Sequence, residues 1–343
     1  MTKNYTKIMM LAVAVMVSMA TFAETKINGI FYNLDSNTKQ AQVTYNGSAP
    51  TAAPTAAPAS ASAYGYTGAV AIPESVTFEG TTYAVTSIGE MAFFESYGLT
   101  AVTIPTSVKT IGDKAFSSCK ALTSITIPNS VMKIGEGAFS GCDGLTGITI
   151  PGSVQDIGMG AFSACNALTS IVVAKDNENY DSRGGCNAII LSANNMLVAG
   201  CKSTMIPNTV TGIGNCAFYG LQSLTSIAIP DSIKTIGDNA FAFCYGLSTV
   251  TIPNSVISVG RGAFMLCTGL NDINIEGYHT SIMSRAFDGC TNIAFVKLKS
   301  QTPPAIDNTT FAVYNELRIP ATALTEYKVS NYWKKFRIVT YKK

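Results

Sequence analysis

The chain has little charge and a single histidine, and both shortages argue against whole classes of function. Charged residues make up 13% of its 343 residues, about half of the ~25% usual in a soluble protein. Basic and acidic residues are nearly balanced, at 23 and 21, so nothing indicates a nucleic-acid partner. The one histidine, His279, has no catalytic motif beside it, so a Ser-His-Asp or Cys-His centre is not indicated. We interpret His279 as a solvated loop residue.

Several motifs that mark enzymes are also missing. The sequence has no dinucleotide-binding, P-loop or nucleophile-elbow motif. Carboxylates that could pair for glycoside hydrolysis stand at variable positions, with no distinguished pair among Asp143, Asp156, Asp231 and Asp238. We therefore expect a protein that is not an enzyme and needs no cofactor or metal. The alternative is a carbohydrate-associated accessory protein or a glycan-acting enzyme, which would need a convergent polar pocket.

The longest apolar run lies near the start of the chain, at residues 8–17. It follows two lysines and is far shorter than the ~20 residues of a membrane-spanning helix. Small residues follow it, which is the layout of a secretory signal peptide. We predict that residues 1–23 are a signal peptide cleaved after Ala23, with Ala20 as the second choice. The mature chain would then have no membrane span and be secreted or held at the cell surface.

What the sequence does contain is a 23-residue repeat. One unit reads LTSITIPNSVMKIGEGAFSGCDG from Leu122, between similar units that begin at Leu99 and Leu145. The register returns from Leu224 onward, after a ten-residue insertion, and the unit from Leu270 is decayed. Self-similarity at such a period indicates a repeat architecture.

Each unit has the residues of one coil of a solenoid. Ile125 and Ile127 share one face of a short strand, and the polar residues between them point outward. Pro128 ends the strand because proline has no N–H to donate. Ile134, followed by glycine, supplies a second inward edge, and Phe139 fills the middle of the coil. One such unit cannot bury its apolar face, so the units must stack.

Stacking turns the repeated positions into columns. We expect the aromatic column to be Phe93, Phe116, Phe139, Phe162, Phe218, Phe241, Phe264 and Phe287. The second-edge column is Ile88, Ile111, Ile134, Ile157, Ile213, Ile236, Val259 and Ile282. The fold class is therefore a leucine-rich-repeat solenoid with short parallel strands in each coil and short or irregular second-edge strands.

The pattern L-x-x-I-x-I-P-x-S-V-x-x-I-G-x-x-A-F-x-x-C resembles the BspA-like leucine-rich repeat family over about residues 67–310. This resemblance implies a secreted or surface-exposed protein of a host-associated bacterium that adheres to host or microbial surfaces. It implies no catalytic residues. The chain departs from the pattern at Ile275-Glu276 and at Met283, so we expect the last coils to be irregular.

The remaining segments cap or interrupt the solenoid. We predict an N-terminal β cap over residues 24–48, with a hairpin turned at residues 35–38, and a Pro/Ala/Ser linker over 49–66. Hairpin insertions near 76–85 and 176–203 interrupt the solenoid of residues 67–310. Residues 311–343 form a mixed C-terminal cap with two strands, a short helix and Trp333 packed against the last coil.

The nine cysteines have two interpretations. Six occupy one repeat position, where we expect buried packing, since no C-x₂-C pair or histidine cluster indicates zinc. Cys186 and Cys201 instead lie symmetrically about a predicted turn between Ala193 and Asn194. In an exported protein they could form a disulfide. The six repeated positions are Cys119, Cys142, Cys165, Cys244, Cys267 and Cys290.

The outward strand positions form the candidate binding face. They are small and uncharged in most coils, and distinctive side chains occur only near the C-terminal end, at Asp272, Asn274, Phe295 and Lys297. An aromatic beside a charge is common in interfaces. We predict weak, extended-surface binding to an extracellular protein or glycan at this end, against the alternative of a plain solvated sheet.

Overall fold

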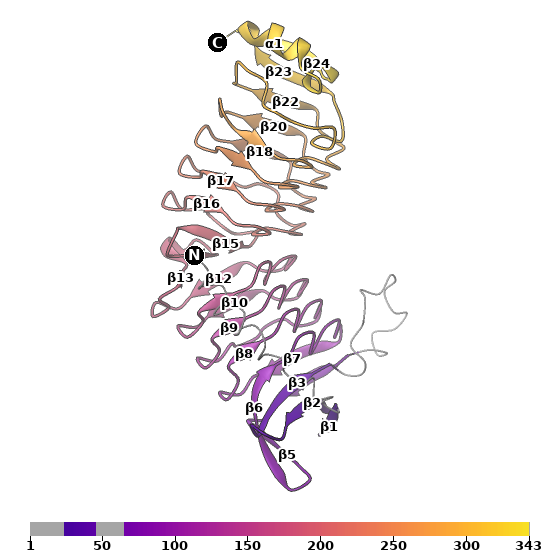
Figure 1. Ribbon diagram of the computed structural model, residues 1–343, viewed down its shortest axis with the longest axis vertical. Coiled ribbons are helices and arrows are strands. Elements are labelled where there is room, and N and C mark those ends of the chain that lie inside the picture. Colours follow the sequence, from indigo (N-terminus) through magenta and orange to yellow (C-terminus); the bar gives the residue numbers. More distant parts are fainter. Residues whose placement is uncertain (1–23, 46–64, 343) are drawn as a thin grey trace, which may run out of the picture.

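The computed structural model describes residues 24–45 and 65–342, and in them the chain forms an elongated stack of about 11 coils (Figure 1). Short strands, mostly parallel, make up most of the regular structure, and the described residues contain one α-helix, α1 (Leu324–Val329). The predicted solenoid of leucine-rich-repeat type is confirmed. The predicted signal peptide and nearly all of the predicted linker lie outside the described residues.

The second edge of each coil is a two-residue strand that pairs with its equivalent in the next coil. In the N-terminal half the end of β6 (Thr81–Ile88) pairs with β8 (Thr110–Ile111), and β9 (Lys133–Ile134) and β11 (Asp156–Ile157) follow. In the C-terminal half the order is β16 (Gly212–Ile213), β17 (Thr235–Ile236), β19 (Ser258–Val259) and β21 (Ser281–Ile282). The pairing is in register at every step within each half, so the predicted isoleucine column forms two parallel ladders, one on each side of the longer insertion.

Glycine follows the isoleucine because neighbouring coils approach closely there. A Cβ atom added at Gly135 would lie 2.5 Å from the backbone nitrogen of Asp113, closer than real Cβ contacts come. A side chain at Gly135 would therefore push its coil away from the preceding one.

The first edge is less regular. Parallel pairs form between β4 (Gly68–Ala71) and β7 (Leu99–Thr103), and between β10 (Gly147–Ile150) and β12 (Ser170–Val173). A longer sheet contains β18 (Thr249–Ile252), β20 (Asp272–Ile275) and β22 (Phe295–Leu298). Residues 122–127 and 224–229 occupy equivalent positions without forming a strand, contrary to the prediction.

The inward and outward alternation persists even where the strand is missing. Ile125 and Ile127 are buried, and Ser124 and Thr126 are exposed. The residue pattern sets burial, whereas a strand also needs short hydrogen bonds to at least one neighbouring strand. A bond that remains beside this coil, from Thr146 N to Thr123 O, is 3.3 Å long. At the turn that carries the repeated phenylalanine, Phe116 N donates to Ala138 O at 2.7 Å, so the coils lie closer there.

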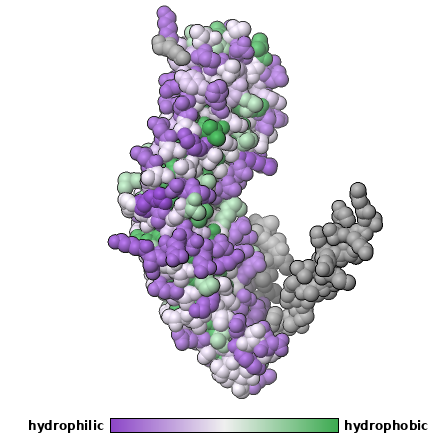
Figure 2. Space-filling view, turned by 60° about the vertical axis from the view of Figure 1, so that its left-hand side comes forward, coloured by the Kyte–Doolittle hydropathy of each residue, from purple (hydrophilic) through white to green (hydrophobic). Residues whose placement is uncertain are grey.

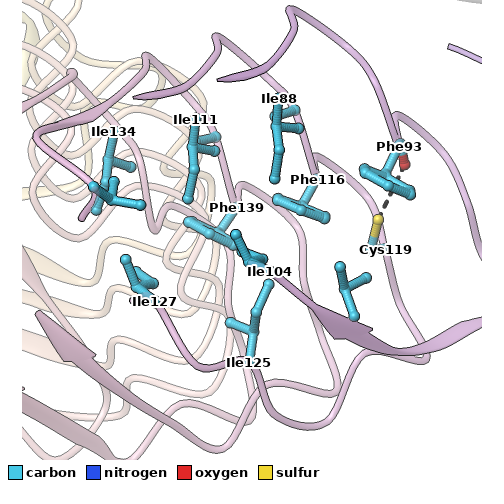
Figure 3. Packing of buried hydrophobic residues seen from close by; sticks show 14 of the residues in the cluster. Ile88, Phe93, Ile104, Ile111, Phe116, Cys119, Ile125, Ile127, Ile134 and Phe139 are labelled. Atoms are coloured by element: carbon cyan, nitrogen blue, oxygen red, sulfur yellow. Dashed lines mark hydrogen bonds between the residues drawn. The ribbon is translucent and has the colours of Figure 1, made fainter. Parts of the chain in front are cut away.

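The predicted phenylalanine column is the centre of the core (Figure 3). All eight side chains are at most 2% exposed. Phe93, Phe116, Phe139 and Phe162 stack with centroids 4.9 to 5.4 Å apart and nearly parallel planes. A second stack runs from Phe218 to Phe287 and continues to Phe311, which the repeat pattern did not include.

The six repeated cysteines are buried free thiols. Each Sγ donates a hydrogen bond of 3.0 to 3.1 Å to the carbonyl oxygen of the ladder phenylalanine one coil earlier, as Figure 3 shows for Cys119 and Phe93. Burial raises the pKa of Cys165 and Cys244 to about 12. The column therefore both packs the core and gives each of these carbonyls a second donor, besides the backbone amide three residues further on.

An antiparallel sheet covers the first coil. Its strands are β1 (Thr25–Ile27), β2 (Ile30–Asp35) and β3 (Gln40–Thr44), and β3 pairs in parallel with β6. Asp35 Oδ1 accepts hydrogen bonds from the amides of Asn37 and Thr38, which shapes the predicted turn. A second hairpin joins β5 (Ser75–Phe78) to β6 across residues 79 and 80.

The longer insertion divides the solenoid. Its strands are β13 (Tyr180–Asp181), β14 (Ala188–Leu191) and β15 (Met196–Gly200), with a 3-10 turn at Arg183–Gly185. Ile189 and Ala199 belong to the core of the N-terminal half, and Ile190 and Leu197 belong to that of the C-terminal half. At the turn that follows the ladder phenylalanines, Ala164 N donates to Tyr219 O at 2.7 Å, so the coils on either side of the insertion are hydrogen-bonded directly to each other there.

The C-terminal cap continues the stack. β23 (Glu316–Pro320) pairs in parallel with β22, and β24 (Arg337–Tyr341) pairs with β23. Two 3-10 turns, Ala321–Ala323 and Trp333–Lys335, flank α1 in sequence. Trp333 is fully buried against Phe311, and its Nε1 donates to Pro304 O at 2.7 Å.

The expectation that the last coils are irregular is wrong. β20 pairs in register with both β18 and β22, and β21 pairs with β19. Glu276, in place of proline, adds a ladder bond from its amide to Ile252 O at 2.9 Å. Ladder bonds come from the backbone and the inward residues are still apolar, so the changed positions do not disturb the coil.

Candidate functional site

The four predicted site residues come together on one surface. Asp272 on β20 lies opposite Phe295 on β22, and Asn274 lies opposite Lys297. All four side chains are half-exposed on the outward face. The surface extends further than predicted, because Phe295 pairs with Glu316 and Lys297 with Arg318 on β23. We call this outward face of β20, β22, β23 and β24 the C-terminal sheet face.

Phe295 is not a free aromatic ring on this face. The Arg318 guanidinium carbon lies 3.6 Å from the centroid of the Phe295 ring, in a close cation–π stack. Lys297 Nζ lies 5.2 Å from the centroid of the Tyr341 ring. One face of each aromatic ring is therefore matched with a cation of the same surface.

Glu316 is the anionic centre of the C-terminal sheet face. It accepts a hydrogen bond from Arg318 Nε and forms an ion pair with Arg337. The hydrogen bond from Arg318 lowers the pKa of Glu316, and the charges of both arginines add to this effect. With Asp272 and Lys297 nearby on the strands, the face presents charges of both signs in fixed positions.

Sequence reasoning missed Glu316, Arg318 and Arg337 because they were assigned to the cap. A signal for the first two is present, since residues 316–320 read ELRIP and the β18 coil reads TVTIP over residues 249–253. The cap therefore begins with one more solenoid strand. No comparable pattern marks Arg337.

The outward face of β18, which precedes this surface in the stack, offers little that is distinctive. Outward residues on β18 are Thr249 and Thr251, both exposed. Figure 2 shows one side of the molecule as largely hydrophilic, with small and separate hydrophobic patches. Scattered patches of this size are ordinary on a protein surface.

A groove of about 600 Å³ lies where the two halves meet on the second edge. Its lining is mainly apolar and includes Ile157, Met159, Met196 and Met283. Tyr180, one repeat after Ile157, lies in β13, which pairs with β14 and not with β11. Its hydroxyl oxygen instead accepts a hydrogen bond from the Ile157 amide at 3.1 Å. The groove follows from the insertion and gathers no set of catalytic groups.

The register of the insertion hairpin separates Cys186 from Cys201. Ala188 pairs with Gly200 and Ile189 with Ala199, but a bulge shifts the next pair to Ile190 and Leu197. A disulfide between the two cysteines would require one uniform register along the hairpin. The bulge instead brings Cys201 to Asn187, whose carbonyl oxygen accepts from Cys201 Sγ at 3.4 Å. Both cysteines are free thiols, so the structure does not contain the proposed disulfide.

Metal binding, His279 and membrane crossing are the remaining points of chemistry that the sequence raises. Among residues 24–45 and 65–342, no group of three or more His, Cys, Asp or Glu side chains is placed to hold a metal ion. His279 is exposed in the loop between β20 and β21. Within the same described ranges, no helix combines the length and apolar character needed to cross a bilayer.

Comparison with solved structures shows the same fold elsewhere. A leucine-rich repeat protein from Bacteroides ovatus is 22% identical, with 93% of this chain and 91% of that chain covered and a TM-score of 0.53. For the pneumococcal vaccine antigen PcpA the identity is 16%, the coverage 94% and 99%, and the TM-score 0.52. A leucine-rich repeat protein from Eubacterium ventriosum is 21% identical, with 91% and 82% covered and a TM-score of 0.54.

Comparison with curated proteins found no match. The family model of the BspA type leucine rich repeat region matches residues 74–184 and 198–318, in six copies. The matched ranges contain the phenylalanine, isoleucine and cysteine columns and leave out the turn of the dividing hairpin. The chain therefore belongs to the BspA-type leucine-rich repeat family.

Proposed function

We propose that this chain is a non-enzymatic binding module that acts outside the cell and binds a macromolecule through its C-terminal sheet face. The observation that carries the proposal is the distribution of outward side chains along the first edge. They are small or hydroxylated on β18, and become charged and aromatic from β20 to β24. A solenoid needs no such change for its own packing, because the inward residues do not alter.

The chemistry of the face favours a protein partner. Asp272, Glu316, Lys297 and Arg318 place both signs of charge on adjacent strands, an arrangement that gives specificity and register in protein interfaces. The flat arrangement across four strands suits an extended contact more than an enclosed ligand. The predicted signal peptide supports an extracellular location, where adhesion is the role that the family resemblance implies.

A binding screen of the mature chain against extracellular matrix proteins and glycans tests this function. For the partner found, the double change Phe295→Ala and Lys297→Ala should weaken binding by roughly tenfold or more, as for residues central to an interface. The melting curve should change little because both side chains are half-exposed. Arg318→Ala should act in the same direction, since it removes the cation stacked on Phe295.

The matched control is Thr249→Ala with Thr251→Ala, on the same edge of the solenoid two coils earlier. Affinity unaltered by the Phe295 and Lys297 changes would place the binding site elsewhere. Hydrolysis of any screened polymer by the mature chain would overturn the non-enzymatic role. Detection of the protein only inside the cells that make it would overturn the extracellular one.

A further inference from the structure

Charge is unevenly distributed along the stack. Residues 24–98 include six acidic and two basic residues, whereas residues 311–343 include seven basic and two acidic ones. The described residues of these two segments lie at opposite ends of the molecule (Figure 1). Without the predicted signal peptide, the chain has 21 basic and 21 acidic residues. It is therefore formally neutral as a whole, but has an acidic N-terminal end and a basic C-terminal end.

The C-terminal end combines positive charge with an exposed apolar side chain. After β23, four lysines are exposed, and none of them forms an ion pair among the residues that the structure describes. Val329, the last residue of α1, is 70% exposed, more than any other large hydrophobic residue in the described part of the chain. The buried residue of α1 is Tyr327, and Val329 is not part of the core. We call the following group the basic end: Lys328, Val329, Lys334, Lys335 and Lys342.

Acidic residues of the same segment do not neutralise the basic end. Glu316 is engaged by Arg318 and Arg337 on the C-terminal sheet face. Glu326, exposed on α1, is then the one acidic residue that remains, beside four lysines without an ion pair. The basic end therefore keeps a net positive charge, which attracts an anionic partner.

We propose that the basic end binds an anionic lipid surface. Negatively charged headgroups attract nearby lysines, and each lysine strengthens such binding by about fivefold. An exposed apolar side chain among the lysines enters the boundary between the headgroups and the acyl chains. Val329 directly follows Lys328, and the lysines of the Trp333–Lys335 turn come next in the same coil. The basic end therefore has both of the groups that binding to an anionic membrane surface uses.

The separation of charge also determines the orientation of the bound molecule. An anionic surface attracts the basic end and repels the acidic residues of 24–98, so both forces turn the elongated stack onto its C-terminal end. Because the chain has no net charge, it is not attracted in other orientations. This inference goes beyond the proposed function and does not rest on it, since the basic end shares no residue with the C-terminal sheet face.

Other anionic partners suit the basic end less well. A soluble polyanion needs the lysines but gains nothing from the exposed Val329. Single-stranded nucleic acid also needs open aromatic faces for its bases. Here Lys335 Nζ lies 4.9 Å from the centroid of the Tyr314 ring and 5.0 Å from that of Tyr332, so a cation already covers one face of each ring. The acidic end of a second copy is the remaining partner, and sedimentation without lipid tests it.

Co-sedimentation of the mature full-length chain with lipid vesicles tests the proposal. At low salt the chain should bind vesicles of phosphatidylglycerol mixed equally with phosphatidylcholine, and should not bind vesicles of phosphatidylcholine alone. The triple change Lys328→Gln, Lys334→Gln and Lys335→Gln should weaken binding roughly a hundredfold, and added salt should act in the same direction. Val329→Ser should weaken binding by roughly fivefold or more. The melting curves should change little, because all four side chains are exposed.

The matched control changes three exposed lysines of the N-terminal half, Lys109, Lys114 and Lys120, to glutamine, which alters the net charge by the same amount. It should bind anionic vesicles as tightly as the parent. The proposal is overturned if the parent does not sediment with anionic vesicles, or if the control loses as much binding as the triple variant of the basic end. Unaltered vesicle binding by Val329→Ser would overturn the lipid partner in favour of a soluble polyanion. Assembly of the chain without lipid, abolished by the triple variant, would assign the basic end to a second copy instead.

Discussion

Removal of one ring from the phenylalanine column measures how far the core depends on stacking between coils. Phe139 is fully buried and lies between Phe116, at 5.2 Å, and Phe162, at 5.4 Å. Burial of a phenylalanine contributes about 1.5–3 kcal/mol, and each ring pair adds about 0.5–1.5 kcal/mol. Phe139→Ala should therefore cost roughly 3–5 kcal/mol, the range found for such truncations.

The assay is denaturant unfolding, followed by circular dichroism and by tyrosine fluorescence. Neighbouring coils stabilise one another, so coincidence of the two probes must be checked before a single free energy is assigned. Met132→Ala, at a side chain that is 43% exposed, is the control and should change stability by less than about 0.5 kcal/mol. A cost below about 1 kcal/mol for Phe139→Ala would refute the role of the column as the centre of the core.

Three other perturbations test separate features. Gly135→Ala should destabilise the chain by about 1–3 kcal/mol, because its Cβ would overlap the preceding coil. The control is Gly147→Ala, where an added Cβ would lie 3.7 Å from its nearest neighbours. Equal melting curves for the two variants would contradict the close approach at Gly135. The ladder cysteines should resist alkylation at pH 8 in the folded protein and react on unfolding, since burial raises the pKa of Cys165 to about 12 and so removes the thiolate at that pH. Rapid modification of the native chain would show that the column is accessible. Peptide mapping without reductant should find Cys186 and Cys201 unlinked, and a cross-linked peptide would contradict the bulged register.

Much of the fold could be predicted because burial in a repeat is a local property. The alternation around Ile125 and the phenylalanine at position 139 recur every 23 residues, so the same positions of each coil are apolar and face inward. Stacking then follows from the need to cover apolar surface. The expectation for the final coils was wrong because it treated outward and turn residues, such as Glu276, as if the ladder depended on them.

The candidate surfaces were predictable only in part. Phe295 and Lys297 could be placed on one face from the repeat register, because equivalent positions of adjacent coils must lie side by side. That Arg318 covers Phe295 depends on β23 joining the sheet, a pairing between the solenoid and a segment outside the repeat. A pattern that ends with the repeat cannot predict it.

The sequence by itself determined the coil, its buried columns and the direction of the stack, because these depend on side-chain character at a fixed period. Tertiary structure alone decided the bulge that separates Cys186 from Cys201 and the continuation of the sheet into the cap. Each of these depends on a register between strands that the 23-residue period does not set. One extra residue in a strand changes that register, and it leaves no mark in the hydrophobic pattern.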